Sequence, residues 1–139
     1  MDDTVIVIME KNLKTGFLEK ELASFTLVEN ENLIVNIFVQ EENERLKTHL
    51  KVSTDRDVSD WEYCAVFDYY DTDIFEKFAE NIIEEEDYYN PTWEIIFDYT
   101  DDISELEKKI AEILNIHKNE LKDVYETIKD KEDEYNDEK

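Results

Sequence analysis

Two similar stretches of the chain carry the residues best placed to do chemistry. Each stretch reads Trp-Glu, then Phe-Asp-Tyr, then an aspartate-rich segment, starting at Trp61 and at Trp93. Asp68 and Asp98 follow the two phenylalanines, near the expected ends of strands. If those strands are parallel neighbours, both Asp-Tyr pairs meet at one sheet edge, where paired carboxylates could perform acid–base chemistry. We favour the simpler interpretation, in which each aspartate ends a strand and leads into a helix cap.

The same region concentrates the negative charge of the chain. The net charge is −24, and residues 68–107 contain 15 acidic residues with Lys77 as the one basic residue. Such a field repels nucleic acids and anionic membranes and attracts basic protein surfaces. We therefore expect a basic partner protein and no direct contact with nucleic acid or membrane. The candidate partner-binding residues are Asp68, Tyr69, Asp71, Asp73, Asp98, Tyr99, Asp101 and Asp102.

The sequence shows no catalytic signature beside these residues. The single glycine, Gly16, excludes the glycine-rich loops that cradle phosphates and dinucleotides. Cys64, the only cysteine, falls in the middle of a predicted strand, where a buried and inert thiol is expected. His49 is expected on the solvated face of its strand, and His117 is expected to pack and hydrogen-bond on the apolar face of a helix. We predict no catalytic residue and no cofactor.

A metal site built from carboxylates is the first alternative. One cysteine and two histidines do not provide the usual zinc ligands. The segment Asp71-Thr72-Asp73 is similar to the start of an EF-hand loop, but the glycine and the later ligands of that loop are missing. A divalent-metal-binding protein or small enzyme that uses carboxylates near Asp68 and Asp98 therefore stays an alternative, and no residue is predicted as a metal ligand.

A DNA mimic is the second alternative that the charge suggests. Spread over a surface of about 7,600 Å², the net charge amounts to about one charge per 320 Å². B-DNA carries about one charge per 100 Å² of its cylinder wall, which is about threefold denser. Inhibition of a DNA-binding protein by mimicry would therefore require the acidic residues to gather on one face.

Apolar patterns predict the elements that must position these residues. Apolar runs and alternation predict strands over 4–10, 17–28, 32–40, 45–53, 61–69 and 93–99. Apolar spacings of three and four predict helices over 71–83 and from Asp102 to about residue 131. The segment 17–28 also fits a helix face, but the preceding turn at Gly16 favours a hairpin strand.

These elements predict an α+β fold. We expect a mostly antiparallel sheet of about five or six strands with two helices on one face, in the order ββββ-β-α-β-α, ending in a long C-terminal helix. Residues 1–129 are predicted to form one domain, and residues 130–139 an acidic tail that is frayed or disordered. A single cysteine and an N-terminus without a basic leader predict a cytoplasmic protein.

Two further expectations concern repetition and assembly. The matching stretches at Trp61 and Trp93 suggest two consecutive strand–helix units, through either duplication or convergence. The last helix should be about 45 Å long and should overrun a domain about 37 Å across. Its end carries an apolar strip, which predicts a homodimer through the C-terminal helix unless the helix bends back. The strip consists of Leu121, Val124, Tyr125 and Ile128.

The function that this sequence favours is binding without catalysis. We expect a small acidic binding or regulatory protein that engages a basic partner protein, because strong negative charge accompanies a lack of catalytic motifs. The carboxylate-based metal protein or enzyme and the DNA mimic stay as alternatives. The sequence names no individual partner.

Overall fold

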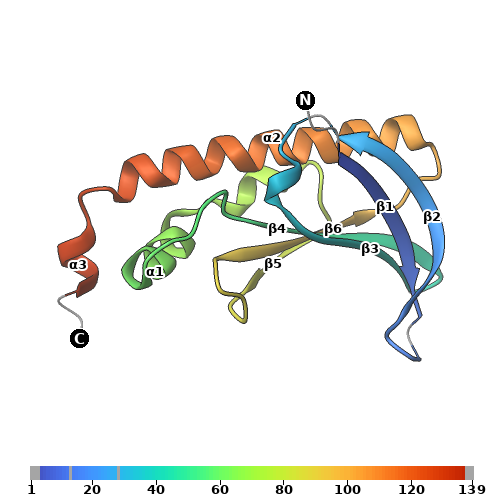
Figure 1. Ribbon diagram of the computed structural model, residues 1–139, viewed down its shortest axis with the longest axis horizontal. Helices are drawn as coiled ribbons and strands as arrows, with labels where there is room; N and C mark the ends of the chain where they lie inside the picture. The colour runs from blue at the N-terminus through green and yellow to red at the C-terminus, as the bar shows by residue number, and fades with distance from the viewer. Residues whose placement is uncertain (1–3, 13, 28, 137–139) are drawn as a thin grey trace.

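Figure 1 shows a computed structural model in which one long helix crosses a six-stranded sheet. The structure describes residues 4–12, 14–27 and 29–136. The strands are β1 (Thr4–Lys11), β2 (Leu18–Leu27), β3 (Ile34–Glu42), β4 (Arg45–Ser53), β5 (Asn81–Glu85) and β6 (Thr92–Asp98). The helices are α1 (Asp60–Tyr69), α2 (Ile103–Ile128) and α3 (Glu132–Asn136), with 3₁₀ helices η1 (Glu31–Leu33) and η2 (Thr72–Phe75).

The sheet is built from three hairpins. Its strand order is β2-β1-β3-β4-β6-β5, and the pairs β1–β2, β3–β4 and β5–β6 are antiparallel. The antiparallel pair β4–β6 and the parallel pair β1–β3 join the hairpins. The predicted α+β class, with a mostly antiparallel sheet and a long C-terminal helix, is confirmed. The segment 17–28, which also fitted a helix, contains β2 as the turn at Gly16 predicts.

Alternation along the strands divides the sheet into two faces. In β4, Leu50 and Val52 are fully buried beneath α2, whereas His49 and Lys51 point to the opposite side. In β1, Ile8 joins the core while its neighbours point away from the helices. We call the side that carries His49 and Lys51 the uncovered face, because α1 and α2 both pack on the other side. In Figure 1 the uncovered face is the side of the sheet that is turned away from α2.

Helix α2 supplies one layer of the core. Asp102 caps its first turn by accepting a hydrogen bond from the backbone N–H of Glu105 at 3.2 Å. Eight side chains along one face, most of them three or four residues apart, are buried, and full burial of each aliphatic one contributes roughly 1.5–3 kcal/mol. They are Leu106, Ile110, Ile113, Leu114, His117, Leu121, Val124 and Ile128.

The apolar strip at the end of α2 is covered by the same chain. Leu121, Val124 and Ile128 are each only 1 % exposed, because α1 packs beside this part of α2. The hydroxyl of Tyr125 donates to Asp55 at 3.0 Å. The exposed strip that motivates a homodimer through the C-terminal helix is therefore absent, and dimerisation through this helix stays a prediction without that support.

The predicted strand over 61–69 is wrong, since this segment forms helix α1. Alternation of Trp61, Tyr63 and Phe67 imitates a strand, but Ser59 and Glu62 form a capping box. The Glu62 carboxylate accepts hydrogen bonds from the backbone N–H and the hydroxyl of Ser59, at 2.9 and 3.1 Å. These bonds start a helix that places Phe67 edge-on against Trp93 of β6.

The predicted helix over 71–83 is also wrong. The chain forms only the short η2, capped by Asp71 through the N–H of Asp73 at 3.0 Å, and then enters β5. β-branched Ile82 and Ile83 suit a strand, and pairing with β6 satisfies the backbone groups of both strands. Tertiary pairing therefore overrides the helical spacing of the apolar residues.

The structure corrects the expectation about repetition and adds a short helix to the predicted tail. Trp61 lies in a helix and Trp93 in a strand, so the matching stretches are not repeated structural units. Within the predicted tail over 130–139, Glu132–Asn136 form the short helix α3. Tyr135 of α3 donates to Asp68 of α1 at 2.7 Å, and residues 137–139 lie outside the described part of the chain.

Within the described ranges, no helix is both long and apolar enough to cross a membrane.

Candidate functional site

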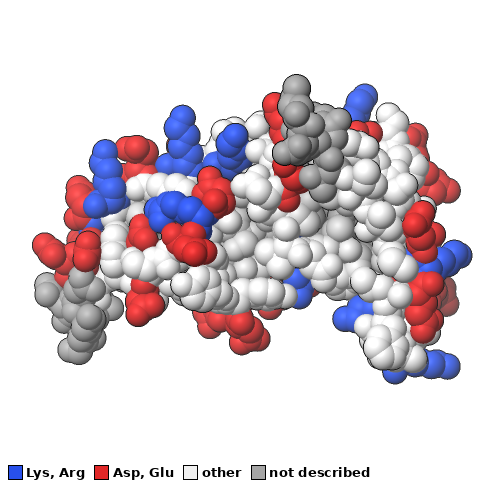
Figure 2. Space-filling view, in the orientation of Figure 1, with Lys and Arg blue, Asp and Glu red and all other residues white. Residues whose placement is uncertain are grey.

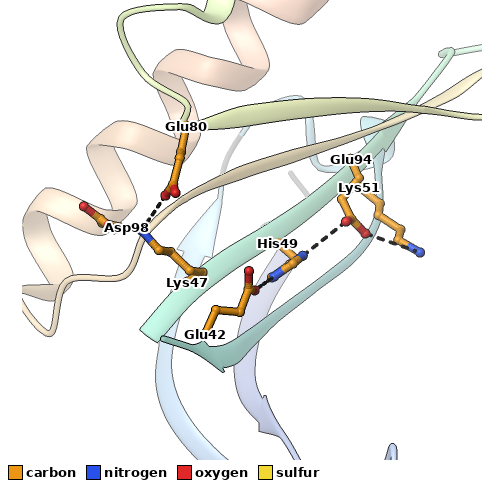
Figure 3. Close-up of polar contacts among 7 residues, drawn as sticks. All are labelled: Glu42, Lys47, His49, Lys51, Glu80, Glu94 and Asp98. Atoms are coloured by element: carbon orange, nitrogen blue, oxygen red, sulfur yellow. Dashed lines mark hydrogen bonds and ion pairs between the residues drawn. The ribbon is translucent and has the colours of Figure 1, made fainter. Parts of the chain in front are cut away.

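A chain of charged side chains crosses the uncovered face, as Figure 3 shows. The His49 ring lies between two carboxylates, with Nε2 at 2.5 Å from Glu42 and Nδ1 at 3.2 Å from Glu94. Lys51 Nζ lies 3.6 Å from the other oxygen of Glu94. The strands β3, β4 and β6 therefore bring together charges that lie far apart in the sequence.

A second group of charges lies beside the first. Lys47 of β4 binds Glu80, which precedes β5, and Asp98 at the end of β6. The hydrogen bonds to Asp98 and Glu80 raise the pKa of Lys47, and the Lys47 ammonium lowers the pKa of Asp98. Three basic side chains of β4 thus face four carboxylates from neighbouring elements, so the two groups nearly balance in charge.

The geometry of His49 argues against general base catalysis. Both ring nitrogens face carboxylate oxygens, which only accept, so both must carry protons and donate. Burial alone would lower the pKa of His49, but the hydrogen bonds to Glu94 and Glu42 outweigh it and raise that pKa. The ring also stacks on Phe38 with the centroids 4.8 Å apart. An imidazolium that donates both N–H groups has no lone pair to accept a proton from a substrate. The contacts of His49 with Glu42 and Glu94 instead link β3, β4 and β6.

His117 is the second histidine, and its predicted structural role is supported by its contacts. Its Nε2 lies 2.7 Å from the carbonyl oxygen of Ser53, so Nε2 donates, and Nδ1 accepts from the Tyr70 hydroxyl at 2.7 Å. Burial lowers the pKa of His117 to about 4. The neutral ring therefore ties α2 to β4 and to the residue after α1, away from solvent.

The predicted burial of Cys64 is wrong. Cys64 is exposed on α1, because the segment is a helix and not a strand. Among the described residues, His49 and His117 hydrogen-bond to groups other than Cys64. The described ranges also contain no group of three or more histidine, cysteine, aspartate or glutamate side chains arranged to hold a metal ion.

The predicted partner-binding residues form two separate groups. In the first group, Asp68 and Tyr69 end α1, and Asp71 and Asp73 belong to η2 and its cap. The backbone N–H of Asp71 donates to Glu120 of α2 at 2.9 Å, which fixes this group against the C-terminal half of the long helix. Tyr69 is 41 % exposed, so the first group presents acidic and aromatic side chains to solvent.

The second group lies near the start of α2. Asp98 binds Lys47, Tyr99 is half-buried, Asp101 is exposed and Asp102 caps the helix. Eighteen residues separate Asp102 from Glu120, which is about 27 Å along a helix.

Asp68 and Asp98 do not form a carboxylate pair. Asp68 lies close enough to Glu84 to raise its pKa, and Glu84 pairs with Trp93 across β5 and β6. Asp98 is five residues further along β6, about 17 Å away at the rise of a strand. The shared sheet edge that the sequence suggests for the two Asp-Tyr pairs is therefore not present.

The first group belongs to a larger acidic surface at one edge of the sheet. We define the acidic edge as six exposed carboxylates that lie at the end of α1, in or next to η2, in β5 and in the turn that follows β5. These are Asp68, Asp71, Asp73, Glu76, Glu84 and Glu86. Residues 60–90 contain 11 acidic residues and one basic residue, Lys77. Figure 2 shows acidic side chains below the body, where Figure 1 places the β5–β6 turn, and basic side chains along α2.

The acidic edge contains carboxylates that repel one another. Partial burial, and then the charges of Glu86 and Asp68, raise the pKa of Glu84. Partial burial, and then Asp71 and Asp123, likewise raise the pKa of the neighbouring Glu120, against the effect of its hydrogen bond from Asp71. This surface therefore holds negative charge at a cost that a nearby cation would reduce.

Sequence reasoning missed the charge cluster on the uncovered face. Glu42, Lys51, Glu80 and Glu94 looked like ordinary surface charges, and His49 looked solvated although it is only 6 % exposed. The alternation in β4 correctly placed Lys47, His49 and Lys51 on one side. Only the pairing of β4 with β3 and β6 shows that carboxylates meet them there, and no local pattern reports that pairing.

Comparisons with known proteins identify one relationship. A family of unknown function (DUF6762) has a model that matches residues 1–136 of the chain. No curated protein and no solved structure matches the chain significantly.

Proposed function

Because the chain belongs to the DUF6762 family, whose function is unknown, we propose a function from its own surface. We propose that it is a small, non-enzymatic binding or regulatory protein whose acidic edge engages a basic partner protein. The observation that carries the proposal is the crowding of exposed carboxylates at the acidic edge, where residues 60–90 hold 11 acidic residues and one basic residue. A lysine or arginine from a partner would relieve the repulsion between these carboxylates on binding, so the free protein favours association with cations.

Tyrosines beside the acidic edge make it suitable for basic side chains. Lys131 already lies over the ring of Tyr69 at 5.3 Å, and Lys51 lies over Tyr88 at 5.4 Å. Tyr89, in the turn after β5, is 80 % exposed, and no cation is found over its ring among the described residues. An aromatic ring beside carboxylates favours lysine and arginine through both charge and cation–π attraction. A basic segment therefore fits this edge better than a neutral one.

Affinity capture from the source cell's lysate tests the proposal. The bait is the folded protein, and the test variant carries Asp73→Asn, Glu84→Gln and Glu86→Gln. These changes remove three charges from the acidic edge without touching the helix caps Asp71 and Asp102. The matched control carries Glu29→Gln, Glu41→Gln and Glu112→Gln, three exposed acidic residues outside the acidic edge.

We expect one defined basic protein to be captured by the wild type and by the control, and to be lost with the edge variant. Recovery should fall as the salt concentration rises, because exposed charges are screened over about 10 Å at 0.1 M salt and over about 3 Å at 1 M. Equal recovery by both triple variants, or recovery of bulk basic proteins alone, would contradict the proposal. Melting temperatures of the three proteins serve as the check on folding.

The remaining expectations stay predictions. A cytoplasmic location is part of the proposal, since a lone cysteine suits a reducing compartment. A carboxylate-based metal protein and a DNA mimic are not favoured by any specific feature of the described residues. The roughly 17 Å between Asp68 and Asp98 removes the geometry on which the first of these depended.

A further inference from the structure

Strand β5 forms an open edge of the sheet. Among the described residues it pairs with β6 alone, and it is the last strand in the sheet order (Figure 1). Every second residue of an edge strand points its backbone N–H and C=O groups away from the sheet. Such groups are a template on which an extended segment of another protein can add as a further strand.

The backbone groups that point outward from β5 belong to Ile82 and Glu84. The carbonyl oxygen of Ile96 in β6 accepts from the Glu80 N–H at 2.8 Å, so the backbone of Ile96 faces β5. Because this direction alternates along antiparallel strands, Asn81, the partner of Ile96, faces β6 and Ile82 faces outward. The Ile82 N–H accordingly donates to the side-chain oxygen of Asn81 at 2.9 Å, where a carbonyl from a further strand would otherwise bind. The outward N–H and C=O of Glu84 have no hydrogen-bond partner among the described residues.

The side chains of β5 define which kind of strand would match this edge. Ile82 packs against the core, so by alternation Glu84 lies on the helix-covered side and Ile83 on the uncovered face. Glu84 is exposed, and Ile83 is 39 % exposed. Side chains that lie opposite each other on neighbouring strands are in contact, so a residue facing Glu84 should be basic and one facing Ile83 should be apolar. The edge therefore suits a segment in which basic and apolar residues alternate.

A groove beside the start of β5 extends the acidic character of this edge. It has a volume of about 240 Å³ and lies between β5 and η2. Asn81 and Ile82 line it from β5, and exposed Asp73 and Glu76 line it from the η2 side. Backbone groups and carboxylates on the two sides of a groove suit a polar main chain that carries lysine or arginine.

Charge distinguishes β5 from β2, which is the other open edge of the sheet. Residues 81–87 contain four acidic residues and no basic residue, whereas residues 18–27 contain two acidic residues and one basic residue. A basic segment is therefore attracted more strongly to β5 than to β2. Two copies of this chain would bring one acidic edge against another, so like charge opposes self-association through β5 and favours a different, basic protein.

We propose that an extended segment of the basic partner protein adds to β5 as a seventh strand of the sheet. Its backbone bonds to the outward groups of Ile82 and Glu84, and one of its carbonyls displaces the Asn81 side chain from the Ile82 N–H. Its basic residues lie beside Glu84 and the carboxylates of the groove, and its alternate apolar residues cover Ile83. The inference rests on the function proposed above and adds the conformation and the sequence pattern of the partner segment.

Binding of a labelled synthetic peptide, followed by fluorescence anisotropy, tests the inference. The probe alternates lysine and valine over about six residues, a typical strand length, and its control carries glutamate in place of lysine. The test variant is Glu84→Pro, which removes an outward N–H and puts a ring in the path of the added strand. The matched control is Glu84→Val, which removes the same charge but keeps the N–H. Edge strands tolerate proline where the N–H faces solvent, so the fold should persist, and circular dichroism checks it.

We expect the wild type and Glu84→Val to bind the lysine peptide, and Glu84→Pro to bind it at least about tenfold more weakly than Glu84→Val does. The glutamate peptide should not bind. In the wild type, the lysine peptide should slow hydrogen exchange of the Glu84 backbone amide, which is a readout that needs no variant.

Other results would overturn the inference. Equal affinity of the two Glu84 variants for the lysine peptide, or an unchanged exchange rate of the Glu84 amide at saturating peptide, would mean that the acidic edge attracts cations without adding a strand. The function proposed above would then stand. A wild type that binds no lysine peptide would also overturn the inference. The proposed function fails separately, if both triple variants capture the same proteins.

Discussion

Replacement of His117 by glutamine should remove a specific pH dependence from the stability of the fold. The neutral ring is held between the Tyr70 hydroxyl and the Ser53 carbonyl, and burial lowers its pKa to about 4. In the unfolded chain the same histidine has a pKa of about 6.5. Glutamine can donate to the Ser53 carbonyl as Nε2 does, but it does not titrate, so His117→Gln isolates the protonation effect.

The sign and size of the effect follow from these two pKa values. As the pH falls below about 6.5, the unfolded histidine gains a proton while the folded one does not, so acidification favours unfolding of the wild type. Between pH 8 and pH 5 the wild type should lose about 2 kcal/mol through this residue. The loss would continue to roughly 3 kcal/mol near pH 3, below the folded pKa. Other groups titrate in both proteins, so they cancel in the difference.

Urea unfolding of both proteins at pH 8 and at pH 5 measures this difference. We expect the free energy of unfolding of the wild type, relative to His117→Gln, to fall by about 2 kcal/mol between the two conditions. The imidazole proton resonances of His117 should stay unchanged over the same range. An unchanged stability difference, or a His117 titration near pH 6.5, would refute a neutral and dry His117 and with it this account of the core.

Two further predictions test features that the sequence did not reveal. The pKa of His49 is raised in the folded protein, so its contribution to stability is fully present below about pH 6.5 and is lost as the pH rises through the folded pKa. In urea unfolding, the free energy of unfolding of the wild type relative to His49→Gln should therefore fall from pH 6 to pH 9. If this difference in the free energy of unfolding grows with pH, His49 is not an imidazolium that donates hydrogen bonds to both carboxylates. Cys64 is exposed, so a thiol reagent should label the folded wild type completely and leave Cys64→Ser unlabelled; labelling that requires urea would show that α1 is misplaced.

Most of the sheet and the last helix could be predicted from local patterns. Alternation in β4 identified which side chains face the core, and spacings of three and four identified the buried stripe of α2 from Leu106 to Ile128. These elements are long and strictly periodic, so the hydrophobic pattern has one interpretation. The segment 17–28 fitted both a helix and a strand, and the turn at Gly16 decided for the strand. Gly16 has a positive φ, which glycine adopts easily in the turn of a hairpin.

The middle of the chain could not be assigned in the same way. Aromatic residues in α1 alternate as in a strand, and only the Ser59–Glu62 capping box separates the two interpretations. The apolar residues of 71–83 fit a helix, but the backbone of β6 offers hydrogen bonds that a strand at Ile82 can use. Both errors arise because short apolar segments fit two periods and tertiary pairing decides between them.

The candidate site was harder to predict than the fold, because its contacts depend on which strands pair with each other. The acidic residues near η2 were visible in the composition, but the separation of Asp68 from Asp98 follows from the order of strands. The contacts of His49 with Glu42 and Glu94 join three strands, and no spacing in the sequence encodes them. The charged residues can thus be counted from the sequence, but only the structure shows which of them pair and neutralise one another.

The position of α2 near the end of the chain has a consequence for synthesis on the ribosome. All three hairpins pair neighbouring segments, so each can form as soon as its second strand emerges. Much of the apolar face that they build lacks its cover until residues 103–128 follow, because α2 is made after all six strands. Every nascent chain therefore passes through a stage in which a nearly complete sheet displays Leu50, Val52 and Ile95 to the cell. At this stage chaperones are most needed, and premature termination before residue 103 would release an aggregation-prone fragment.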